Sequence, residues 1–183
     1  LHKEYRRQRQ MCIRDRLQQL AGEVQCLLGG FQLGLGGGAF GNQLLALLLG
    51  GKAERASGGW GVGIHRYQLT EQPEWMTPAL DELTLLISHQ DQVTRLPENA
   101  TLLATSPFCA HAAYRIGDQV LCFQGHPEFV PEYSRALLDI RQQHIGETTY
   151  RAAVGTLHED HHGRTVGEWM LRFVANGKAS QPA

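Results

Sequence analysis

A histidine and a carboxylate stand two residues apart at His126 and Glu128, directly after an apolar run. A histidine at the end of a strand can remove a proton from a thiol, and a neighbouring glutamate can hold its ring in the working tautomer. Gly125 and Pro127 shape the backbone around the pair. On its own, this spacing more often marks a structural histidine. A second group is therefore needed before His126 and Glu128 are interpreted as an acid–base pair.

That second group is the segment Gly38-Ala39-Phe40-Gly41-Asn42-Gln43. Glycines on both sides of an exposed residue permit the sharp strand-to-helix turn of a nucleophile elbow. The apolar run at 44–49 predicts a helix behind it, whose free N–H groups could stabilise an anion. The exposed position is Ala39, which has no nucleophilic atom. The sequence thus predicts the frame of a nucleophile site without its reactive group.

The elements that position these residues are predicted to be strands interleaved with helices. We expect strands at 31–35, 62–70, 83–88, 102–105, 112–116 and 120–123, and a hairpin at Gly117-Asp118. Helices are expected at 17–28, 42–49, 132–144, 147–156 and 166–175, and the second should be buried on most sides. This pattern predicts an α/β domain, in which ligands bind at the carboxyl ends of strands.

Composition places the chain among globular proteins. Its 183 residues suit one domain, and 42% hydrophobic with 19% charged residues is ordinary for that class. No apolar run approaches the roughly 20 residues that span a bilayer, and the N-terminus does not resemble a secretory signal. The cysteines have no CxxC spacing. We therefore expect a cytoplasmic protein with reduced thiols and no membrane contact.

Residues 1–16 differ from the rest of the chain by their concentration of basic side chains. Such an arm could touch nucleic acid, but no aromatic residue accompanies it in a stacking platform, so we predict no nucleic-acid partner. The run Met11-Cys12-Ile13-Arg14-Asp15-Arg16 resembles a translated sequencing-adaptor remnant. We interpret residues 1–16 as a disordered or artefactual leader and 17–183 as the domain.

Three ordered motifs together resemble a class I glutamine amidotransferase domain, of the type found in the glutaminase half of GMP synthase. The segment ending at Gln43 matches the family's Gly-x-Cys-x-Gly-x-Gln at every fixed position except the cysteine. Residues 125–128 match Gly-His-Pro-Glu in full, and residues 88–93 are similar to the loop that helps to seat substrate glutamine. The resemblance covers roughly residues 34–176, and three motifs in order make chance unconvincing.

The resemblance implies a flavodoxin-like fold, with a doubly wound, mostly parallel sheet and an added antiparallel hairpin. It also implies a Cys-His-Glu triad, in which a thiolate attacks the side-chain amide of glutamine and ammonia passes to a synthetase domain or partner. His126 would act as base and then acid, Glu128 as its orienter, and the Phe40 N–H as half of an oxyanion hole. No cofactor or metal is implied. The implied substrate-binding residues are Gly41, Gln43, His89, Gln90 and Asp91.

The chain departs from this pattern at Ala39. Loss of the nucleophile costs triad enzymes about six orders of magnitude in turnover, so we predict that this copy is inactive. Only 38 residues precede Ala39, fewer than a doubly wound sheet normally needs, and we expect an N-terminal truncation. Of the remaining thiols, Cys122 is interpreted as a buried apolar residue, while Cys109 stays open.

Three functional hypotheses remain. The natural gene encodes an active glutaminase-type enzyme; or the chain is a pseudoenzyme or binding module that keeps a glutamine-sized pocket; or it is a hydrolase that transfers no ammonia, which needs the same cysteine. The run His158-Glu159-Asp160-His161-His162 has metal-ligand residue types. Adjacent loop residues rarely converge on one ion, so we predict no metal site there.

Overall fold

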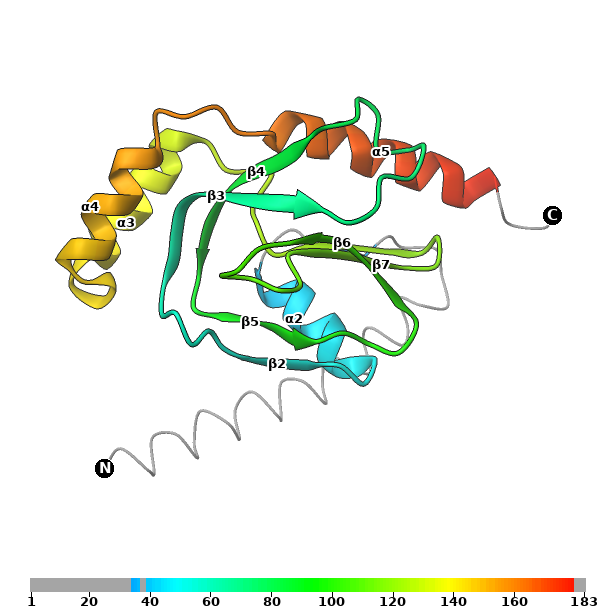
Figure 1. Ribbon diagram of the computed structural model, residues 1–183, viewed down its shortest axis with the longest axis horizontal. Coiled ribbons are helices and arrows are strands. Elements are labelled where there is room, and N and C mark those ends of the chain that lie inside the picture. The colour runs from blue at the N-terminus through cyan, green and yellow to red at the C-terminus, as the bar shows by residue number, and fades with distance from the viewer. Residues whose placement is uncertain (1–33, 37–38, 180–183) are drawn as a thin grey trace. The chain divides into compact units, whose positions relative to one another are not determined.

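The computed structural model describes residues 34–36 and 39–179 (Figure 1). The chain divides into two units, residues 1–33 and 34–183, and every described residue belongs to the second. The leader expected at 1–16, the boundary at residue 17 and the helix expected at 17–28 lie outside the described residues. These three statements stay predictions.

A six-stranded sheet forms the centre of the described unit, with the spatial order β1-β8-β7-β6-β3-β4. The two strands that precede the predicted functional motifs, β1 and β8, pair in parallel, and the other neighbouring pairs are antiparallel. The predicted hairpin at Gly117 is confirmed, because Ile116 pairs with Val120 across it. The strands are β1 (Gly34–Gly36), β3 (Gly61–Leu69), β4 (Glu82–His89), β6 (Ala100–Thr105), β7 (Ala113–Ile116) and β8 (Val120–Phe123).

The α/β class is confirmed, whereas the mostly parallel, flavodoxin-like sheet is not. Among the described strands, only β1 and β8 are parallel neighbours. Parallel neighbours need a crossover connection, usually through a helix. Residues 49–130 are all described and contain no helix. The strands from β3 to β8 are therefore joined by turns and loops, which favour the antiparallel pairs observed.

A separate two-stranded sheet was not predicted from the sequence. It consists of β2 (Lys52–Arg55) and β5 (Asp91–Arg95), which pair antiparallel. Helix α2 (Ala39–Leu48) contacts both of these strands, and its Ala46 joins Val93, Tyr114 and Cys122 in a buried cluster. The prediction that this helix is buried on most sides is wrong at its carboxyl end, where three consecutive leucines, Leu47, Leu48 and Leu49, are 40–43% exposed.

The carboxyl-terminal part contains α3 (Pro131–Ile145), α4 (Glu147–Thr156) and α5 (Gly163–Ala179). Proline at the first helical position of α3 supplies a preset φ and lacks only an N–H that would stay unbonded there. Figure 1 shows α3 and α4 side by side, and α4 also contacts β3. Helix α5 buries Val166, Trp169 and Phe173. None of the helices among the described residues is long and apolar enough to cross a membrane.

Gly63 is the point where α4 meets β3 most closely. Its φ is +84°, and a Cβ there would lie 2.6 Å from Thr156 Oγ1. The same hydroxyl oxygen accepts a hydrogen bond from the Ile64 N–H at 2.9 Å. Both the backbone conformation and the contact therefore require glycine at position 63.

The outer edge of β4 is covered by two other segments of the chain. Thr84 N–H donates to His162 Nδ1 at 3.0 Å, and the His162 N–H donates back to Thr84 O at 2.8 Å. Two residues further along β4, Leu86 O accepts from the His126 N–H at 2.8 Å. The loop between α4 and α5 thus packs on β4, and His162 is engaged in that contact. Within the described ranges, no three His, Cys, Asp or Glu side chains gather as a metal site.

Candidate active site

Strand β1 precedes helix α2 in the chain, which is the strand-to-helix order predicted for an elbow. Strand β1 ends at Gly36 and α2 begins at Ala39, with Phe40 and Gly41 as its next residues. The first N–H groups of a helix have no intrahelical acceptor, and the helix dipole favours an anion beside them. The amino end of α2 can therefore offer N–H groups to a developing negative charge. The oxyanion role of Phe40 itself stays a prediction.

His126 and Glu128 are in direct contact. The distance between His126 Nδ1 and Glu128 Oε1 is 2.9 Å, and the histidine side chain is 9% exposed against 49% for the glutamate. The imidazole also stacks on the Phe129 ring, with 3.9 Å between centroids and 9° between planes. Two contacts therefore fix the ring orientation. The carboxylate contacts Nδ1, so Nε2 is the ring nitrogen outside this contact.

The chain approaches β4 closely where it leaves β8. A Cβ on Gly125 would lie 2.8 Å from Leu85 Cβ. The neighbouring His126 N–H bonds to Leu86 O, as described above. Only glycine allows the two backbones to come this near. The contact brings His126 beside the strand that ends at His89.

His89 is placed at the end of β4 rather than in a loop. It is 4% exposed, and within the described part of the chain neither ring nitrogen lies in hydrogen-bonding geometry with a partner. Burial, together with the proximity of His65 and His126, lowers the pKa of His89 to about 4. The imidazole is therefore neutral at pH 7. A buried neutral ring with two unengaged nitrogens can serve as a hydrogen-bond donor and acceptor toward a ligand.

The other predicted substrate residues contribute to contacts within the protein. Gln43 Nε2 donates to the main-chain oxygen of Asp91, the first residue of β5. Gln90 Oε1 accepts from Arg55 Nη2 at 3.0 Å. The expected loop at 88–93 is in fact the end of β4, a bend at Gln90 and most of β5. Gln43 joins this segment to α2, so two of the three motifs are linked directly.

Two buried amides link α2 to the third motif, and the sequence did not single them out as functional. Asn42 Nδ2 donates to Gln124 Oε1 at 3.2 Å, and both residues are 0% exposed. The hydroxyl of Tyr114 donates to Asn42 O, also at 3.2 Å. One signal was available: Gln124 directly precedes the motif at residues 125–128. The position of Asn42 beside Gln43 is a second signal.

Residues 37–139 match the family Glutamine amidotransferase class-I. The chain belongs to this family. Its amidotransferase match includes α2, the end of β4 and the His126–Glu128 pair, which are the segments that the structure brings together.

Named relatives fall into two groups. The chain is 35% identical over 106 residues to "Gamma-glutamyl peptidase 3" of Arabidopsis thaliana, covering 55% of this chain and 43% of the relative. It is 37% identical over 103 residues to "GMP synthase [glutamine-hydrolyzing]" of Streptococcus mutans, covering 54% of this chain and 20% of that protein. The chain thus spans less than half the length of these curated relatives.

Solved structures share the fold. A glutamine amidotransferase from Thermotoga maritima superposes with a TM-score of 0.57 at 19% identity, over 78% of this chain and 60% of that one. A glutamine amido transferase from Methylobacillus flagellatus gives a TM-score of 0.59 at 22% identity, over 76% and 61%. The described α/β arrangement is therefore similar to the folds of these two structures.

The two described cysteines of this amidotransferase domain do not resemble the family's nucleophile. Cys109 and Cys122 are both 0% exposed and free. Burial raises the pKa of Cys109 to about 12 and that of Cys122 to about 11. Both are thiols at neutral pH, whereas the thiolate is the reactive form. The alternative that Cys109 supplies the nucleophile is therefore not supported.

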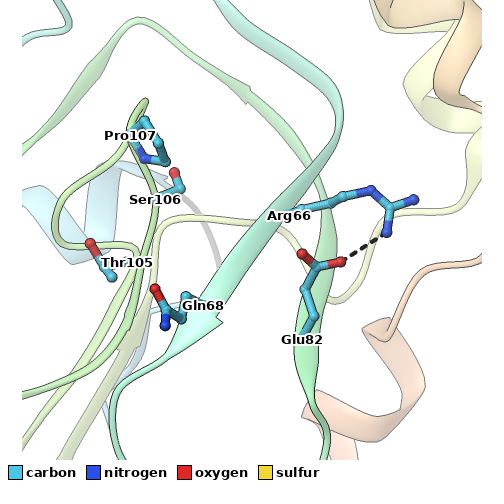
Figure 2. A pocket seen from close by; sticks show the side chains of 6 residues that line it. All are labelled: Arg66, Gln68, Glu82, Thr105, Ser106 and Pro107. Atoms are coloured by element: carbon cyan, nitrogen blue, oxygen red, sulfur yellow. Dashed lines mark hydrogen bonds and ion pairs between the residues drawn. The ribbon is translucent and has the colours of Figure 1, made fainter.

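A pocket of about 520 Å³ lies apart from the predicted site residues. Figure 2 shows Arg66 of β3 paired with Glu82 of β4 on one side, and Thr105, Ser106 and Pro107 on the other. Arg66 also bonds to Glu159 at 2.6 Å, and its own side chain is 57% exposed. This hollow is lined by solvated side chains whose charges are already paired. It does not contain any residue of the three amidotransferase motifs.

Proposed function

We propose that this domain binds the γ-glutamyl amide group of glutamine, and that this copy does not hydrolyse it because position 39 carries alanine. The observation that carries the proposal is the 2.9 Å contact between His126 Nδ1 and Glu128 Oε1. It occurs on a segment bonded to β4 through Leu86 and to α2 through Asn42. Amide hydrolysis by a thiol requires an acid–base pair near a group that stabilises an oxyanion, and the pair lies on a segment bonded to the first turn of α2.

The chemistry of this arrangement follows if a cysteine occupies position 39. His126 Nε2 takes the thiol proton, and the thiolate attacks the carbonyl carbon of the side-chain amide. N–H groups at the start of α2 stabilise the oxyanion of the tetrahedral intermediate. Collapse of that intermediate breaks the C–N bond, and His126 returns the proton to the departing ammonia. Water then hydrolyses the thioester, with His126 again acting as base and Glu128 stabilising the imidazolium.

With Ala39, no residue in the described part of the chain offers a thiolate for the covalent step. Cys109 and Cys122 are buried thiols of raised pKa, so neither replaces the missing group. What remains is a site that can bind an amide but not cleave it. We therefore favour a pseudoenzyme or binding module, which keeps a glutamine-sized pocket. The alternative is that the natural gene encodes cysteine at this position and an active glutaminase.

Two ligands share the relevant chemistry. Glutamine is the γ-amide of glutamate, and the names of the two groups of relatives refer to glutamine hydrolysis and to γ-glutamyl peptides. We propose glutamine as the primary ligand and a synthetase as the partner, on the similarity to GMP synthase. The similarity to γ-glutamyl peptidases favours a second candidate, a γ-glutamyl peptide without ammonia transfer. The cytoplasmic location stays a prediction.

Binding and turnover test the proposal separately. We expect ligand-observed NMR to detect binding of glutamine or of a γ-glutamyl dipeptide, and His89→Ala to weaken it. We expect no ammonia release from the chain as it stands. Binding of the dipeptide alone would select the second candidate. Binding of neither would contradict the pocket, and ammonia release that His126→Ala abolishes would contradict the inactivity.

The variant Ala39→Cys tests the chemistry. We expect it to acquire slow ammonia release, and the additional change His126→Ala to reduce the rate by at least about a hundredfold, the usual contribution of a general base. Equal rates with and without His126 would contradict the role assigned to that residue.

A further inference from the structure

We propose that Asn42 and Gln124 are positioning residues that hold the first turn of α2, and with it position 39, in register with His126. The inference rests on the proposed function, because it concerns the geometry of the same site. It goes beyond it by assigning a role to a buried contact that neither binds ligand nor transfers protons. The contact is the 3.2 Å hydrogen bond from Asn42 Nδ2 to Gln124 Oε1.

Each partner of this hydrogen bond lies close in the sequence to a position with a proposed role in the site. Residues 39 and 42 are three apart in α2, so they are neighbours on one side of the helix. Gln124 and His126 are two apart in a segment whose N–H groups bond to Ala112 O and Leu86 O, at 2.7 Å and 2.8 Å. The two residues flank Gly125 in the bend that follows β8, so main-chain hydrogen bonds hold this bend on both sides. A bond between residues 42 and 124 therefore fixes the neighbouring pair, 39 and 126, as well.

The contact is specific rather than a simple source of stability. Both side chains are 0% exposed. Asn42 Oδ1 and Gln124 Nε2 have no hydrogen-bond partner among the described residues, although each has lost access to water. Burying an amide with one unengaged group destabilises the folded state relative to an apolar pair of the same shape. Replacing both partners of a buried hydrogen bond by apolar side chains of similar shape can be neutral or stabilising, so we explain the two amides by the geometry that they impose.

Neighbouring residues restrict how far the first part of α2 can move. Tyr114 is 0% exposed and its hydroxyl donates to Asn42 O, so the main chain of the helix turn is held as well as the side chain. Ala46, one turn further along α2, packs in the buried cluster with Tyr114 and Cys122. Loss of the hydrogen bond between Asn42 and Gln124 therefore does not detach α2 from the sheet. It frees the first turn to rotate or slide by a small amount, which is enough to misplace a reacting atom.

A thiol at position 39 reports this geometry without requiring turnover. We place Ala39→Cys in the full chain with Cys12→Ser and Cys26→Ser, and measure the thiol pKa from the pH dependence of alkylation. The remaining cysteines are buried and of raised pKa, so they react slowly. A nearby histidine and a helix amino terminus lower a thiol pKa. We expect a value at least about one pH unit below the ordinary 8.5.

Adding Gln124→Leu or Asn42→Leu should return the thiol pKa to within about half a unit of the ordinary value, and lower the Tm by roughly 5 °C. The double change Asn42→Leu with Gln124→Leu should recover most of the Tm but not the lowered pKa, because an apolar pair packs without fixing the register. A structural role alone predicts that pKa and Tm recover together. Recovery of both would therefore overturn the proposal.

Thr156→Val is the matched control, because it removes a part-buried hydroxyl contact between α4 and β3. It should lower the Tm while the pKa of the thiol at position 39 is unchanged. A lowered pKa that persists in Gln124→Leu would overturn the positioning role alone. An ordinary pKa in the Ala39→Cys chain itself would contradict the proposed site, and the inference with it.

Discussion

The candidate site and the hollow drawn in Figure 2 are both polar, but they differ in how their polar groups are satisfied. In the hollow, Arg66 is 57% exposed and pairs with Glu82 and Glu159, at 2.9 Å and 2.6 Å. In the candidate site, Asn42, Gln124 and His89 are buried, and each keeps atoms without a hydrogen-bond partner among the residues that the structure describes. Solvated ion pairs contribute little and constrain little. Buried groups with unengaged atoms are costly, so they are the better indicator of a function.

The largest expected effect that tests this contrast is the dependence of folding stability on pH. His89 has an ordinary pKa of 6.5 and a folded pKa of about 4, chiefly because of burial. As the pH falls, His89 therefore becomes protonated in the unfolded chain before it does so in the folded chain. The contribution to stability is complete above about pH 6.5 and is lost as the pH falls toward about 4. The full loss is roughly 3 kcal/mol.

We expect urea unfolding of the chain to show this loss between pH 7 and pH 4.5, and His89→Leu to remove most of it. His65 and His162, whose pKa values burial also lowers, should leave a residual slope. An identical slope in the chain and in His89→Leu would show that the buried ring is not the source.

Gly125→Ala tests how tightly the site is built. Its Cβ would lie 2.8 Å from Leu85 Cβ and 2.9 Å from Leu85 Cδ1, so β4 and the His126 segment must separate. We expect a loss of roughly 2 kcal/mol in the free energy of unfolding and weaker glutamine binding. Gly155→Ala in α4 is the matched control, because nothing lies within 4 Å of the added atom. It should stabilise the chain by about 0.5–1 kcal/mol, and a similar loss in both variants would contradict the close approach.

Arg66→Ala in the hollow should have the smallest effect. Exposed ion pairs contribute about 0–1 kcal/mol, and added salt should shrink the difference further. Calorimetric unfolding at low and high salt measures it, with glutamine binding as the second readout. A loss of glutamine binding in Arg66→Ala would reverse the comparison and move the ligand site to the hollow.

The elements that the sequence predicted well are those with an apolar pattern of their own. Helix α4 was predicted with the observed bounds, Glu147–Thr156, and so was β8, Val120–Phe123. Strands β2 and β5 were missed because Lys-Ala-Glu-Arg and Asp-Gln-Val-Thr-Arg have no apolar alternation. Their pairing depends on each other and on α2, which no local pattern reveals. The mostly parallel sheet was expected from the family resemblance and is not confirmed, because the described strands from β3 to β8 have no crossover helices between them.

The site was predicted where its residues are close in the sequence. His126 and Glu128 are two residues apart, and their contact could be expected from the motif. Asn42 and Gln124 are 82 residues apart, and their contact depends on how α2 packs against the sheet. Likewise, the burial of His89, and hence its low pKa, is produced by neighbours from other strands. Sequence motifs thus identified the candidate residues, whereas the contacts that hold them in place were visible only in the structure.

The covered edge of β4 has a consequence for association between copies of the protein. An open edge strand presents unpaired N–H and C=O groups that can recruit a strand from another molecule, which is a route to aggregation. Here the main-chain groups of Thr84 and Leu86 form hydrogen bonds with His162 and His126 of the same chain. His126, which is proposed for proton transfer through its side chain, therefore also covers part of the β4 edge through its backbone. Its N–H helps to prevent β4 from becoming a template for intermolecular sheet growth.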